Sequence, residues 1–149
     1  MWPFKKKTFF SEGEKERIVQ AIRQAERMTS GEVRVFVESR CRFVDPMDRA
    51  TEVFDKLEMQ KTRQHNGVVL YVAMEDRQFA IYGDTGIHQK VGMDFWKQQA
   101  QNLKGFFSKG EFVVGIAQCV KEIGASLETY FPYESDDENE LPDDIVFGK

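Results

Sequence analysis

The chain has 149 residues, of which 41% are hydrophobic and 31% charged, and its formal net charge is -4. A domain of this length can bury a sufficient core without disulfides or a structural metal, and the composition excludes a disordered protein. Seven of the 25 acidic side chains lie in residues 134–144, so the remainder is nearly neutral, and its basic cluster Lys5-Lys6-Lys7 is too small to bind a nucleic-acid backbone.

We do not expect a targeting signal in this sequence. No apolar run approaches the roughly 20 residues that a transmembrane helix needs, and the first residues, MWPFKKKTFF, lack the apolar core and cleavage site of a secretory signal. Cys41 and Cys119 do not have the spacing of a metal motif and are interpreted as free thiols in a reducing compartment. We therefore expect a cytoplasmic protein with no membrane span and no nucleic-acid partner.

The first predicted elements are a helix and a strand. A helix should begin after Ser11, because the segment SEGE is a capping box in which Ser11 and Glu14 exchange hydrogen bonds. Its apolar stripe continues to about Met28. The segment EVRVFVES then alternates valines with other side chains, and this period of two predicts a strand over residues 33–38.

The next segment predicts a helix and a hairpin. Asp45 is placed as an N-cap, with Pro46 at the first position of a helix that should end near Thr62. Residues 67–73 are almost continuously apolar, which is typical of a central strand. The four residues MEDR can close a hairpin onto a strand over residues 78–83. The first two strands should be parallel, joined by a right-handed crossover through the helix.

Two helices are predicted after the hairpin. Asp94 can cap a helix that carries Trp96 and Leu103, and a longer helix follows from Glu111 and stops at Pro132. A fourth strand is only weakly signalled, by KTFF or by DDIVFG.

This order of elements predicts an α/β fold, a three-layer α/β/α sandwich with a mixed, mostly four-stranded sheet. The domain should comprise residues 11–133. An N-terminal segment (1–10) would precede it and an acidic C-terminal tail (134–149) would follow it.

The predicted topology collects polar side chains at one end of the sheet. Asp84 follows the third strand and Asn66 precedes the second, so the hairpin should bring them together, and Glu32 at the entrance of the first strand should reach the same end. Ca²⁺ and Mg²⁺ bind carboxylate, amide and backbone oxygens, and the glycines of GDTG would allow a tight turn with a further carbonyl ligand. We therefore predict a metal site formed by Asp84, Asn66 and Glu32.

The opposite end of the sheet offers a second acidic rim, formed by Glu38, Asp48, Glu75 and Asp76, which we rank lower. Asp48 is also explained by its place in the first turn of a helix, and Glu75 and Asp76 by the hairpin turn. The sequence shows no zinc-ligand spacing, P-loop, dinucleotide fingerprint or nucleophile elbow, so it identifies no catalytic residue.

Several segments together resemble the TPM domain family, which includes a thylakoid acid phosphatase and a photosystem II repair factor. They are SGEVRVFVE, NGVVLYVAMEDRQFAIYGDTGI, FW and GEFVVGIAQCVKEIGASLETYFP, and the ending NELPDDIVFG resembles a small stand-alone bacterial branch. The resemblance covers roughly residues 10–147. It implies an α/β/α sandwich with a divalent-cation site, with Asn66 and Asp84 as the first matching positions and Glu32 as the next. Many relatives carry a signal peptide and a membrane helix. Neither is expected here, so the cellular location of those relatives is not assigned to this protein.

The leading hypothesis is a domain that binds Ca²⁺ or Mg²⁺ to stabilise loops at one end of the sheet. An alternative is a slow metal-dependent phosphomonoesterase that uses the same cluster, in which the cation would activate water. This alternative is an analogy of fold, because no nucleophile can be matched residue by residue. A third hypothesis is a non-catalytic interaction module that binds an unknown protein partner through the acidic tail and the aromatic surface around Trp96.

Overall fold

The structure, a computed structural model, describes residues 9–133 and 145–148. Helices and strands alternate in its first part, and two long helices precede the last strand. The elements in chain order are α1 (Glu12–Arg27), β1 (Glu32–Glu38), α2 (Pro46–Lys56), the short 3-10 helix η1 (Met59–Lys61), β2 (Gly67–Ala73), β3 (Gln78–Gly83), α3 (Thr85–Ser108), α4 (Phe112–Tyr130) and β4 (Val146–Phe147).

The described strands form one mixed sheet in the order β3-β2-β1-β4. β1 is parallel to both β2 and β4, and β3 is antiparallel to β2. Glu32 is paired with Gly67, and Val68 with Gly83, so β1 and β2 begin at the end of the sheet where β3 finishes. The predicted four-stranded mixed sheet is confirmed, and its fourth strand comes from the segment DDIVFG.

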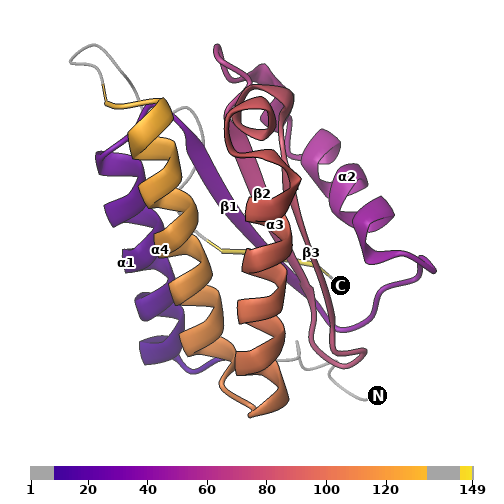
Figure 1. Cartoon of the computed structure of the whole chain (residues 1–149). Coiled ribbons are helices and arrows are strands. Elements are labelled where there is room, and N and C mark those ends of the chain that lie inside the picture. Colours follow the sequence, from indigo (N-terminus) through magenta and orange to yellow (C-terminus); the bar gives the residue numbers. More distant parts are fainter. Residues whose placement is uncertain (1–8, 134–144, 149) are drawn as a thin grey trace, which may run out of the picture.

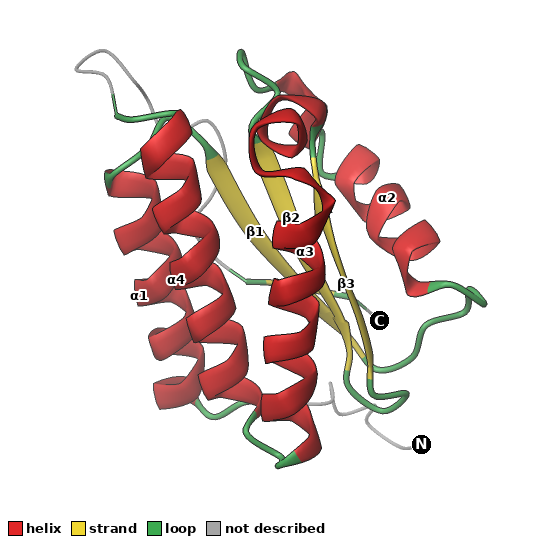
Figure 2. Cartoon of the chain, viewed as in Figure 1, coloured by secondary structure: helices red, strands yellow, loops and turns green. Residues whose placement is uncertain are grey.

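Helices cover both faces of the sheet. α1, α3 and α4 lie on one face and α2 lies on the other (Figures 1 and 2). Successive side chains of a strand point to opposite faces, so Val33, Val35 and Val37 of β1 join the larger core with α1, α3 and α4, whereas Phe36 joins a smaller core with α2. The three-layer α/β/α sandwich is therefore confirmed.

The first two helices begin where their caps were predicted. Ser11 Oγ accepts a hydrogen bond from the Glu14 amide at 3.2 Å, and the Glu14 carboxylate accepts one from the Ser11 amide at 2.9 Å. Asp45 accepts a hydrogen bond from the Met47 amide at 2.9 Å, and Pro46 is the first residue of α2. These side chains satisfy amides that would otherwise have no partner at a helix start.

The start of α3 differs from the prediction. α3 begins at Thr85, and its backbone leaves helical geometry at Gly92, where φ is 77°, so only the second part of the helix starts near the predicted Asp94. GDTG therefore does not form the expected tight turn, because Gly83 ends β3 and Gly86 lies inside α3. Glycines lower helix propensity, which hid the first turns of this helix from the pattern.

The two predicted terminal segments fall largely outside the described residues, which include only residues 9 and 10 of the first and residues 145–148 of the second. Phe10 is buried in the larger core, and Val146 and Phe147 pair with β1. Both segments thus contribute residues to the folded body. Throughout the parts of the chain that are described, no helix is long and apolar enough to cross a membrane.

Candidate functional site

The three residues predicted as metal ligands lie at the same end of the sheet. The Glu32 amide donates to the Asn66 carbonyl at 3.3 Å, and the Asp84 amide donates to the Gly67 carbonyl at 2.9 Å. Their side chains are buried, with exposed fractions of 2% for Glu32, 1% for Asn66 and 6% for Asp84. The backbone of the sheet therefore brings the three positions together, as the hairpin and the parallel crossover predicted.

Asp84 is the N-cap of α3. Its Oδ1 accepts a hydrogen bond from the Thr85 amide at 2.7 Å. Its Oδ2 is buried and accepts no hydrogen bond, although His65 Nδ1 lies 3.4 Å away and would form an ion pair if the imidazole were protonated. One carboxylate oxygen thus stabilises the helix start, and the other is buried without a hydrogen-bond donor.

Asn66 presents a second buried oxygen. Its side-chain amide nitrogen donates to Ser30 Oγ at 3.3 Å, and its backbone amide donates to Thr62 Oγ1 at 3.2 Å. Its Oδ1 accepts no hydrogen bond. A buried acceptor without a donor costs about 1–3 kcal/mol, and a cation bound at this oxygen would offset that cost.

The loop of residues 62–66 crosses the first turn of α3 at Gly86, and we call this the loop crossing. A Cβ atom at Gly86 would overlap the carbonyl oxygen of Gln64 and lie 2.6 Å from that of His65, so the approach requires a glycine. The Ile87 amide donates to the His65 carbonyl at 3.3 Å, which fixes the loop on the helix. Backbone oxygens are thereby held next to the helix turn that Asp84 caps.

Glu32 lies on the same face of β1 as Phe36, toward α2. Its Oε2 is also buried and accepts no hydrogen bond, although the side chain takes part in other interactions within the chain. No group of three His, Cys, Asp or Glu side chains that could hold a metal ion occurs within residues 9–133 and 145–148. A cation at the loop crossing would therefore need amide, backbone and water oxygens besides the carboxylate.

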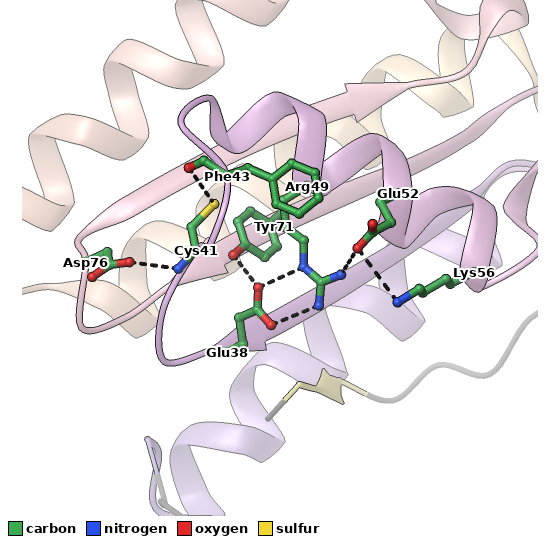
Figure 3. A network of polar contacts seen from close by, with 8 residues as sticks. All are labelled: Glu38, Cys41, Phe43, Arg49, Glu52, Lys56, Tyr71 and Asp76. Atoms are coloured by element: carbon green, nitrogen blue, oxygen red, sulfur yellow. Dashed lines mark hydrogen bonds and ion pairs between the residues drawn. The ribbon is translucent and has the colours of Figure 1, made fainter.

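Glu38 of the second acidic rim is held by a network of polar contacts at the other end of the sheet (Figure 3). Arg49 donates to it twice, from Nε to Oε2 and from Nη2 to Oε1, each at 2.9 Å, and the Tyr71 hydroxyl donates to Oε2. Arg49 Nη1 also donates to Glu52. The hydrogen bonds from Arg49 to Glu38 raise the pKa of Arg49 above its ordinary value. Glu38 is thus a structural ion-pair partner.

The other residues of the second acidic rim do not form one cluster. Asp48 lies in the first turn of α2 and is exposed. Glu75 forms an ion pair with Arg40 at 3.3 Å, and Asp76 accepts a hydrogen bond from the Cys41 amide at 2.8 Å. The sequence interpretation missed Arg49 and Tyr71, which no local pattern distinguishes from an exposed helix residue and an ordinary core residue.

Comparison with known proteins shows a close structural relative. The model of the TPM domain family matches residues 4–126. The BA42 protein of the psychrophilic bacterium Bizionia argentinensis is 42% identical, and its structure has a TM-score of 0.88, with 97% of this chain and 99% of BA42 covered. The N-terminal domain of the cg2496 protein from Corynebacterium glutamicum is 16% identical, with a TM-score of 0.66 and coverage of 90% and 84%, and shares the fold. No curated protein matches the chain.

Proposed function

The chain belongs to the TPM domain family, and from this premise we propose that it binds a divalent cation, Ca²⁺ or Mg²⁺, at the loop crossing. The observation that carries the proposal is the presence of two buried side-chain oxygens, Asp84 Oδ2 and Asn66 Oδ1, that accept no hydrogen bond. Hard cations bind oxygens of both kinds. The residues present therefore fit such an ion.

The role of the cation would be to link separate segments of the chain. Asn66 ends the loop that crosses α3, and Asp84 begins that helix, so an ion bound to both would join the loop to the helix start. Glu32 remains the third candidate ligand, from the adjacent strand. Because binding to the folded state alone stabilises it, the cation would raise the free energy of unfolding and order the loop.

The test is an NMR titration of isotopically labelled protein with CaCl₂ and then MgCl₂, following the backbone amides. Asp84→Asn is the informative variant, because asparagine caps a helix as well as aspartate does while the charge is removed. Asp94→Asn removes the same charge from an exposed position in α3 and serves as the matched control.

We expect saturable shifts in residues 62–66 and 84–88 and near Glu32. The affinity should fall at least about tenfold in Asp84→Asn and stay unchanged in Asp94→Asn. Shifts confined to the second acidic rim or to the acidic tail, or no shifts at millimolar metal, would contradict the proposal.

The phosphomonoesterase hypothesis stays a prediction that uses the same site. It requires release of phosphate from a generic ester, dependent on the cation, above the level of the Asp84→Asn protein. Equal release by both proteins would exclude it, while the cation titration would still stand.

A further inference from the structure

A pocket of about 670 Å³ lies at the opposite end of the sheet from the loop crossing. It opens where β1 ends, beside the last residue of that strand, Glu38. Its charged lining consists of four cations and two carboxylates, which are Arg40, Arg42, Arg49, Lys56, Glu38 and Glu52. The lining therefore carries an excess of positive charge in a chain whose formal net charge is negative.

The position of this pocket is one at which α/β folds commonly bind ligands. It lies at the carboxyl end of β1, which is parallel to its neighbours β2 and β4. The segment that leaves β1 passes to α2 on one face of the sheet (Figure 1). In open α/β sheets, ligands bind outside the carboxyl ends of the strands.

The base of the pocket is fixed by the Glu38 network (Figure 3). All three nitrogens of the Arg49 guanidinium donate to carboxylates, two bonds going to Glu38 and one to Glu52. The guanidinium also lies over the ring of Phe36, 5.3 Å from its centroid. The charge of the Arg49 guanidinium is therefore already balanced by carboxylates, and its orientation is fixed. Its role toward a ligand is to position the side chains around it.

The cations at the mouth of the pocket are less constrained. Lys56 is 3.7 Å from Glu52, which it shares with Arg49. Arg42 is exposed on the loop after β1 and has no ion-pair partner within the described residues. Arg42 and Lys56 can therefore both turn toward an anion, and Phe43 next to Arg42 gives the pocket an apolar wall.

We propose that this pocket binds a small organic anion through an oxyanion group, a carboxylate or a phosphate, with Arg42 and Lys56 as the binding cations. A guanidinium presents two parallel N–H groups that match the two oxygens of such a group. The two carboxylates of the lining limit the charge that the pocket accepts, so a mono- or dianion fits better than a polyanion. The proposal needs no metal and does not depend on the cation site.

The test uses metal-depleted, isotopically labelled protein and two probes, succinate and inorganic phosphate, each compared with sodium chloride at the same ionic strength. We expect saturable amide shifts in residues 38–43 and 49–56 that chloride does not produce. The double variant Arg42→Gln, Lys56→Gln should weaken binding at least about tenfold. The matched control is Lys97→Gln, Lys104→Gln, which removes two exposed cations from α3.

The two probes also identify the ligand chemistry. Binding of succinate alone assigns a carboxylate, binding of phosphate alone assigns a phosphate, and binding of both assigns an oxyanion of either kind. The proposal is overturned if neither probe saturates, if chloride gives the same shifts, or if the control variant weakens binding as much as the double variant does. Arg42 and Lys56 are both exposed, so we expect the double variant to fold. Its amide spectrum checks this directly.

Discussion

The Tyr71 hydroxyl of β2 donates a hydrogen bond to the carboxylate of Glu38, the last residue of β1. Tyr71 has an exposed fraction of 0% and Glu38 of 5%, so the bond lies inside the smaller core. Burial raises the pKa of Tyr71 above its ordinary value, and the hydrogen bond to Glu38 raises it further. The hydroxyl therefore stays protonated and keeps donating to the carboxylate group that accepts from Arg49.

The first prediction concerns this hydrogen bond. Tyr71→Phe removes the donor and leaves the ring in place, so the free energy of unfolding should fall by about 1.5–3 kcal/mol, the range for hydrogen bonds to charged groups. Urea denaturation followed by circular dichroism measures the change. Tyr130→Phe is the control, because that side chain is 44% exposed on α4, and an equal loss in both variants would show that the buried bond has no special role.

The second prediction concerns the loop crossing. Gly86→Ala places a methyl group against the Gln64 carbonyl, and we expect it to lower the free energy of unfolding by about 2–3 kcal/mol, because backbone atoms must move. Gly105→Ala is the matched control within the same helix. A Cβ there meets nothing within 4 Å, so that variant should be stabilised by about 0.5–1 kcal/mol. Equal free energies of unfolding for Gly86→Ala and Gly105→Ala would contradict the close approach of the two backbone segments at the loop crossing.

A third expectation separates the two thiols. Burial raises the pKa of Cys119 to about 12, with a smaller effect from Glu122, and thiolates are the species that react with iodoacetamide. Cys119 should therefore be alkylated at least about 100-fold more slowly than the half-buried Cys41 in the native protein at pH 8. Mass spectrometry should count one modified thiol without urea and two in urea. Two modified thiols at equal rates under native conditions would show that the α4 helix does not shield Cys119.

The fourth prediction follows from the same pKa. In the unfolded chain the Cys119 thiol ionises near its ordinary value of 9.0, whereas the folded protein holds its proton up to about 12. The unfolded state then binds fewer protons over this range, so the free energy of unfolding should fall as the pH rises from 9 to 12, by up to about 1.4 kcal/mol per pH unit. Tyr71 acts in the same direction. Cys119→Ala should make the fall less steep, and Cys41→Ala should have a smaller effect, because Cys41 only adds to the raised pKa of Tyr71; a pH profile unchanged by Cys119→Ala would count against this account.

Most of the fold follows from local sequence signals. Caps at Ser11 and Asp45 act over a few residues, as do the valine alternation of β1 and the short turn between β2 and β3, and each began the expected element. The end of α2 differs from the prediction, since the helix stops at Lys56 and not near Thr62, because the left-handed backbone of Glu58 breaks it. The start of α3 could not be predicted from such local signals, because Gly86 is required by a contact with the loop of residues 62–66. Such a contact joins segments that a periodic pattern treats separately.

The candidate site, like the fold, could be predicted from the sequence only in part. The common position of Asp84, Asn66 and Glu32 followed from the strand order alone, since a hairpin and a parallel crossover place these ends together. Cation binding there stays a prediction. The pairing of Glu38 with Arg49 could not be predicted, because it joins a strand end to the side of a helix whose rotation about its axis the sequence does not give.

The pairing of β4 with β1 has a consequence for how the protein is made. Phe36 and Val37 pair with Val146 and Phe147, so a ribosome must synthesise the whole of α2, β2, β3, α3 and α4 before this part of the β1 edge can be covered. During that interval β1 exposes an unpaired row of backbone amides and carbonyls, which is the feature that promotes strand addition between chains. A nascent chain stalled before Ile145 should therefore aggregate more readily, or recruit chaperones more strongly, than one released after Gly148.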